Sequence, residues 1–108
     1  FVERQYVSES LKYGGTSDIY AKIDDVLEMI ELKTGSGIWP EHFIQCAANF
    51  MLLKENGENP ARARVLNIPR AENEAFAESI VPNIDKNFEL FKCCLQIYNL
   101  KKELKGGE

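Results

Sequence analysis

Residues 16–34 read TSDIYAKIDDVLEMIELKT, and this stretch decides the fold. Polar and apolar residues alternate over 16–23, which is typical of a β-strand with two different faces. Asp24 and Asp25 then supply a two-residue turn, and a mostly apolar run follows over 26–34. The stretch therefore predicts an antiparallel hairpin whose second strand is buried on both faces.

Further elements are expected on both sides of this hairpin. Residues 1–9 are rich in β-forming side chains, and a turn containing Gly14 and Gly15 is expected before the hairpin begins. Pro40 fits the first turn of a helix that is apolar nearly all round. The expected order is strands over 1–9, 16–23 and 26–34, a helix over 40–56, a strand over 61–68, a polar acidic segment over 71–79, and a helix over 83–104. It predicts an α+β fold with a mixed sheet, in which a three-stranded antiparallel meander is followed by helix, strand and helix.

Size and composition fit one ordinary globular domain over residues 1–108. The chain is 44% hydrophobic and 28% charged, and no apolar stretch is long enough to span a membrane. The first residues given show no basic region followed by an apolar stretch, and the three cysteines show no metal-binding spacing, so we expect a reducing, cytoplasmic setting. Cys46, Cys93 and Cys94 are expected to be small packing residues in apolar helices.

The hairpin register brings charged residues together. If Asp24 and Asp25 form the turn, paired residue numbers add up to 49, and Asp18 then lies opposite Glu31. Like charges on directly opposite residues destabilise a sheet. Lys33 projects from the same face as Glu31 because side chains alternate along a strand. Two carboxylates and one ammonium are thus expected in one cluster.

A divalent metal ion would relieve this repulsion. Mg²⁺ prefers oxygen ligands and is commonly held by one or two carboxylates together with water and substrate phosphate. Such an ion activates water for attack on a phosphodiester. The alternative is a structural ion cluster in which Lys33 neutralises the two carboxylates, although one ammonium leaves the cluster net negative.

Gly15-Thr16-x-Asp18, then Glu31-x-Lys33, then Gln45 in the next helix resembles the PD-(D/E)xK nuclease superfamily, and within it the RecB-like exonuclease branch. That branch has GxxD, then (D/E)xK, then a glutamine that begins a QxxxY motif. The resemblance spans about residues 3–50, and Asn49 stands where the branch usually has tyrosine.

The resemblance implies a restriction-endonuclease-like core and a role for each matching residue. Asp18 and Glu31 are expected to bind Mg²⁺ or Mn²⁺, with the main-chain carbonyl of Leu32 as a third ligand. Lys33 is expected to be the catalytic lysine and Gln45 to position substrate or water. For Gln45, an ordinary place on an exposed helix stripe is nearly as good an interpretation.

The family also carries a helix before its first strand, which would precede Phe1. We therefore expect the 108 residues to be a fragment that lacks this N-terminal helix. The expected helices leave one face of the sheet short of cover. Either an additional N-terminal segment or association into a homo-oligomer is expected to cover it.

Charge is distributed unevenly along the chain. Residues 1–58 carry ten acids and five bases, whereas residues 59–108 carry seven acids and eight bases. Arg62, Arg64 and Arg70 lie in this second half. Solvent-exposed charge is the first interpretation of each of them, and contact with nucleic-acid phosphates is the second.

These observations predict a Mg²⁺- or Mn²⁺-dependent deoxyribonuclease, a hydrolase acting as an exonuclease in DNA repair, recombination or phage DNA processing. Two alternatives stay open. One is a catalytically inactive nuclease-fold module that binds nucleic acid or a protein partner. The other is a structural subunit that binds neither metal nor DNA.

Overall fold

Five strands form one sheet in the order in which they occur along the chain, β1-β2-β3-β4-β5. The computed structural model describes residues 2–106. The elements are β1 (Val2–Ser8), β2 (Tyr13–Ile23), β3 (Val26–Thr34), α1 (Pro40–Glu55), β4 (Arg62–Ile68), β5 (Ala77–Ile80) and α2 (Ile84–Gly106). Strand β4 pairs in parallel with β3, and the other neighbouring strands pair antiparallel. The predicted α+β class with a mixed sheet and an antiparallel meander is confirmed.

Two sequence-based expectations about strands are wrong. Strand β2 begins at Tyr13, so Gly14 and Gly15 lie inside a strand and pair with β1, and the turn falls over residues 9–12. Residues 77–80 form β5, although no strand was expected at the polar acidic segment over 71–79, because they pair with β4 at the edge of the sheet. Polar side chains are compatible with an edge strand, since one of its sides stays in water.

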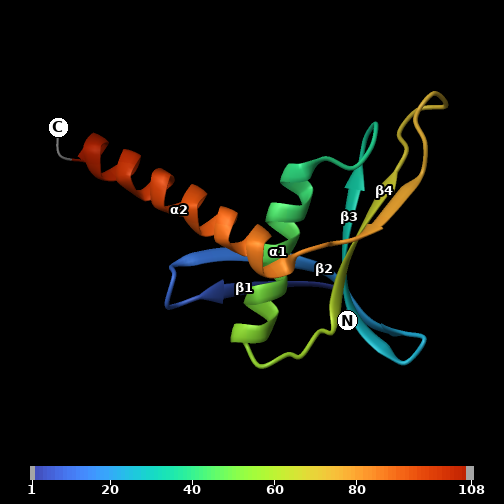
Figure 1. The fold of residues 1–108 in the computed structure, drawn as a ribbon, viewed down its shortest axis with the longest axis horizontal. Coiled ribbons are helices and arrows are strands. Elements are labelled where there is room, and N and C mark those ends of the chain that lie inside the picture. The colour runs from blue at the N-terminus through green and yellow to red at the C-terminus, as the bar shows by residue number, and fades with distance from the viewer. Residues whose placement is uncertain (1, 107–108) are drawn as a thin grey trace.

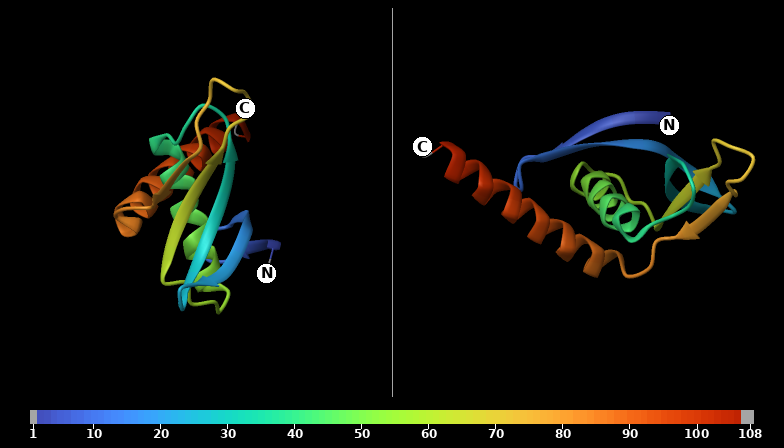
Figure 2. Two further views of the ribbon diagram at one scale, coloured as in Figure 1. Left: turned by 90° about the vertical axis from the view of Figure 1, so that its right-hand side faces the viewer. Right: turned by 90° about the horizontal axis from the view of Figure 1, so that it is seen from above.

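Helix α1 lies in the concave side of the curled sheet, with α2 on its far side (Figure 2). This sandwiched position explains why α1 is apolar on several sides. Its buried residues pack against side chains of β2, β3 and β4. Together with Val81, which follows β5, they form the core, namely Tyr20, Met29, Cys46, Phe50, Leu53, Ala63, Val65 and Val81. The helix starts at Pro40, as predicted, and ends before Gly57, which adopts a φ of 94°.

Helix α2 packs on α1 through one side only, and its C-terminal end projects away from the sheet (Figure 1). The ring of Phe91 contacts that of Tyr13, with centroids 4.7 Å apart, but no residue of α2 is buried. The expectation that Cys93 and Cys94 are packing residues is wrong, because both are exposed, whereas Cys46 is buried as expected.

Both helices lie on the same side of the sheet (Figure 2). Within residues 2–106 no helix covers the opposite face, on which Leu32, Ile68 and Ile80 are exposed. Neither helix within residues 2–106 is long and apolar enough to cross a bilayer.

Candidate functional site

The observed hairpin register is the predicted one. Pairs run from Ile23 and Val26 at the turn to Ile19 and Ile30, and the two numbers of each pair add up to 49. The backbone pairing of β2 with β3 ends at Ile19 and Ile30, and Asp18, the residue before Ile19, bonds to β3 through its side chain. Oδ2 of Asp18 accepts a hydrogen bond from the backbone N–H of Leu32 at 2.9 Å. The two strands therefore part at the position where the carboxylates were expected to face each other.

Glu31 lies at this point on the face covered by α1, and it is only 4% exposed. Its Oε1 accepts a hydrogen bond of 2.8 Å from Nδ2 of Asn49. Burial raises the pKa of the Glu31 carboxyl, and the negative charge of Asp18 raises it further, against the opposing effects of Asn49 and Lys33. The pKa of Glu31 therefore responds to Asp18 and to Lys33, the two charged residues expected beside it.

Lys33 lies two residues further along the same face of β3. Its Nζ donates a hydrogen bond of 3.3 Å to Oε1 of Gln45. Gln45 is exposed, but it points to the lysine and not only to solvent. The structure thus brings together all four residues expected to be catalytic, namely Asp18, Glu31, Lys33 and Gln45.

Asn49 is the residue whose contact with Glu31 sequence reasoning missed, since it was noted only as a departure from tyrosine. A Cβ atom on Gly15 would lie 2.1 Å from Oδ1 of Asn49 and 3.0 Å from Cδ1 of Leu52. Only glycine leaves room for Asn49 to pass over β2 and reach Glu31. Two positions in the sequence could have indicated this contact. Gly15 lies three residues before Asp18, and Asn49 lies one helical turn after Gln45.

Asp18 and Glu31 are the two carboxylates of this site that could hold a divalent cation. Asp18 and Glu31 each use one carboxylate oxygen in the hydrogen bonds above, and within residues 2–106 their other oxygens receive no hydrogen bond. No group of three or more Asp, Glu, His or Cys residues converges anywhere in the same range. Two carboxylates suit Mg²⁺ or Mn²⁺, which fill their remaining positions with backbone carbonyl, water and phosphate oxygens.

Arg62 and Arg64 lie on the opposite face of the sheet, where both bind the carboxylate of Glu28. Nε of Arg64 lies 2.8 Å from Oε1 of Glu28. The hydrogen bond from Arg64 has the largest effect on the pKa of Glu28, and together with that from Arg62 it holds this pKa below its ordinary value despite burial. Sequence reasoning gave no role to Glu28, which is fully buried. The structure does not bring Arg62 and Arg64 to the candidate site, and their contact with nucleic acid stays a prediction.

Arg70 is nearer to the candidate site. Its Nη2 lies 3.7 Å from the position that a Cβ atom on Gly35 would take, and Gly35 follows Lys33 by two residues. The Arg70 side chain is largely exposed and lies 3.9 Å from a carboxylate oxygen of Glu74. Its proposed role as a phosphate contact is compatible with this place.

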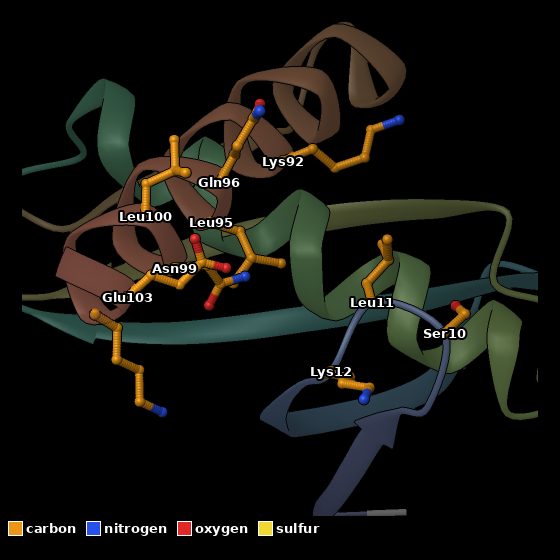
Figure 3. Close-up of a pocket in the computed structure, with 10 residues that line it drawn as sticks. Ser10, Leu11, Lys12, Lys92, Leu95, Gln96, Asn99, Leu100 and Glu103 are labelled. Carbon is orange, nitrogen blue, oxygen red and sulfur yellow. The ribbon is translucent and has the colours of Figure 1, made fainter. Parts of the chain in front are cut away.

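A hollow of about 720 Å³ lies between the β1–β2 turn and α2, away from the candidate site (Figure 3). It is lined by Leu11 and Lys12 from the turn and by Lys92 and Leu95 from the helix (Figure 3). None of the four expected catalytic residues lines it. The hollow is therefore a surface feature separate from the candidate site.

Comparison with protein families and with curated proteins gives no relative from which to transfer a function. No protein-family model matches the chain, and no curated protein matches it.

Proposed function

We propose that this chain is a metal-dependent deoxyribonuclease that hydrolyses phosphodiester bonds, most simply as an exonuclease in DNA repair, recombination or phage DNA processing. The observation that supports it best is the pair Asp18 and Glu31 at the parting of β2 and β3, with Lys33 on the same face and bonded to Gln45. The resemblance of Gly15-x-x-Asp18, Glu31-x-Lys33 and Gln45 to PD-(D/E)xK nucleases supports the same function.

Each residue has a task in this proposal. A bound Mg²⁺ or Mn²⁺ supplies activated water and offsets charge on the phosphodiester. Asp18 and Glu31 would hold the ion, together with the main-chain carbonyl of Leu32. The Lys33 ammonium orients the attacking water or offsets charge that develops on the phosphate oxygens. Gln45 fixes the ammonium in position, since it accepts a hydrogen bond from Nζ.

The decisive experiment compares DNA cleavage by the parent chain and by Lys33→Ala, with Mg²⁺, with Mn²⁺ and with EDTA. We expect cleavage by the parent only when metal is present, and loss of at least two orders of magnitude in Lys33→Ala with its fold and metal binding retained. Lys22→Ala is the matched control, because Lys22 is an exposed lysine next to the turn of the same hairpin. A Lys33→Ala chain that cuts as fast as the parent would remove the catalytic assignment.

A second candidate, a nuclease-fold module that binds nucleic acid or a protein without cutting, is favoured by one observation. Asn49 stands in place of the usual tyrosine and is bonded to Glu31. Both candidates expect millimolar Mn²⁺ to raise the thermal midpoint, because it binds the folded state and relieves repulsion, and both expect Asp18→Asn to weaken that rise. DNA binding without any metal-dependent cleavage would favour the second candidate. No response of the midpoint would favour a structural subunit.

DNA is the proposed partner, and self-association is proposed as the means of covering the apolar surfaces that residues 2–106 leave open. A reducing, cytoplasmic setting belongs to the same proposal. Its support is chemical, since Cys46, Cys93 and Cys94 are free thiols.

A further inference from the structure

A pocket of about 290 Å³ opens between β2, α1 and α2. Its lining includes Tyr13, Gly15 and Thr16 from β2, Gln45 and Asn49 from α1, and Phe91 from α2. The pocket is at the small end of the range for ligand sites, which suits one nucleoside and not a base pair.

Two of these residues also belong to the candidate catalytic site. Gln45 accepts a hydrogen bond from Lys33, and Asn49 donates one to Glu31. A group held in the pocket would touch the same amides that hold the lysine and the buried carboxylate. The pocket therefore adjoins the place where a phosphodiester would be cut.

The chemistry of the lining selects a neutral, flat group. No charged side chain lines the pocket, so it does not suit a phosphate. Thr16, Gln45 and Asn49 offer donors and acceptors, which match the edge of a nucleobase. The rings of Tyr13 and Phe91, tilted by 55° to each other, offer an aromatic wall.

Tyr13 is well fixed in this wall. Its hydroxyl donates a hydrogen bond of 2.8 Å to the backbone carbonyl of Ala48. Burial, assisted by the charge of Glu55, raises the pKa of Tyr13 to about 12, so the ring stays neutral. Gly15 has no side chain, and the space above it is taken by the Asn49 side chain, which holds this amide at the lining of the pocket.

We propose that this pocket holds an unpaired nucleobase of the strand being cut, and that the chain therefore acts on single-stranded DNA. The inference rests on the proposed nuclease function. A base inside a duplex is stacked and paired, and bringing it into the pocket would cost a few kcal/mol, whereas a base in a single strand is free to enter. Stacking on an aromatic side chain contributes about 1–3 kcal/mol per base.

The test measures binding separately from cleavage. Fluorescence anisotropy with a short labelled oligothymidylate and with a labelled duplex, in low salt and EDTA, gives dissociation constants without hydrolysis. Phe91→Leu removes the ring but keeps apolar packing on Tyr13. Phe88→Leu is the matched control, since Phe88 stacks on Phe91 with centroids 6.2 Å apart on the same helix but does not line the pocket.

We expect Phe91→Leu to weaken single-strand binding about tenfold, the size of one lost stack, with duplex binding unchanged and Phe88→Leu like the parent. Equal binding by Phe91→Leu and parent, or cleavage of duplex but not of single strands, would overturn the pocket and leave the nuclease function standing. Loss of single-strand binding in Phe91→Leu, beside a parent chain that never cleaves with metal, would keep the pocket and overturn the nuclease function.

Discussion

Two glutamates of strand β3 show how strongly one face of a sheet differs from the other. Glu28 and Glu31 are both buried, but they point to opposite faces. Glu28 receives two arginines, which lower its pKa, whereas burial and then the charge of Asp18 raise the pKa of Glu31 against the single amide of Asn49 and the charge of Lys33. The first carboxylate is satisfied by the protein itself. The second is left electrostatically unsatisfied, which suits a site that binds a cation.

The same substitution at these two positions should therefore have opposite effects at neutral pH. Glu28→Gln leaves Arg62 and Arg64 without their anion and should lower the free energy of unfolding by about 2–3 kcal/mol, less than for a fully buried pair because the arginines are partly exposed. Glu31→Gln keeps an acceptor for Asn49 and removes a desolvated charge, so it should raise that free energy on the order of 1 kcal/mol. Urea unfolding of both variants and the parent measures the two effects.

The pH dependence distinguishes the two causes. The folded pKa of Glu28 is lowered, so its contribution is present above the ordinary value of 4.5 and is lost as pH falls through the lowered pKa. The folded pKa of Glu31 is raised, so its contribution is present below 4.5 and is lost as pH rises through the raised pKa. The gain from Glu31→Gln should hence grow from pH 4.5 towards neutrality. A gain that is constant with pH would show that ionisation of Glu31 is not its cause.

At the scale of elements, the site depends on a match of spacing between a strand and a helix. Glu31 and Lys33 are two residues apart on β3, roughly 7 Å along a strand. Their hydrogen-bond partners Asn49 and Gln45 are four residues apart on α1, roughly 6 Å along a helix. One turn of α1 thus serves both side chains of the strand. Helix α1 runs antiparallel to β3, so the earlier strand residue, Glu31, meets the later helix residue, Asn49, and Lys33 meets Gln45.

The turn of the β2–β3 hairpin fixes the register that puts Asp18 beside Glu31. Asp24 and Asp25 have φ values of 51° and 64°, the left-handed region that a two-residue hairpin turn of this kind requires. We predict that Asp25→Gly raises the free energy of unfolding by about 0.5–1 kcal/mol, because glycine adopts this conformation without the steric cost of a Cβ atom.

Asp25→Ala is the matched control for the turn. Alanine keeps the Cβ atom and loses the local hydrogen bonding that lets aspartate tolerate positive φ, so it should lower the thermal midpoint. The midpoints of the parent, Asp25→Gly and Asp25→Ala, measured by circular dichroism, should fall in the order glycine, aspartate, alanine from highest to lowest. The reverse order would mean that Asp25 does more for the folded state than its backbone conformation indicates.

At the scale of the whole molecule, apolar surface is left open in two places. One is the sheet face without a helix. The other is a stripe on α2, in which Leu90, Ile97 and Leu104 follow each other at intervals of seven residues and are 52%, 55% and 73% exposed. Apolar residues repeated at this interval form one side of a helix, the arrangement through which helices associate.

We predict that the chain self-associates through this stripe on α2. Light scattering across a range of concentrations should give a mass above that of one chain, and Ile97→Glu should shift it towards a single chain by placing a charge in the centre of the stripe. Asn99→Glu adds the same charge on another side of the same helix and should leave the mass as in the parent. A parent chain that stays monomeric at every concentration would exclude the stripe as an association surface.

The sequence by itself determined the hairpin, its register and the grouping of Asp18, Glu31 and Lys33. These follow from local rules, namely alternation along a strand and the geometry of a two-residue turn, which require no knowledge of distant contacts. The α1 boundaries followed for the same reason, since a proline and a glycine mark its ends.

Only the tertiary structure decided what each charge meets. That Asn49 binds Glu31, that Gly15 makes room for it, and that Glu28 collects Arg62 and Arg64 depend on which helix covers which face and on the parallel pairing of β3 with β4. Strand β5 likewise formed because the edge of β4 was available to pair with, although the segment before it is polar and acidic. These contacts join positions far apart in the chain, and pairing over such distances leaves no periodic signal in the sequence.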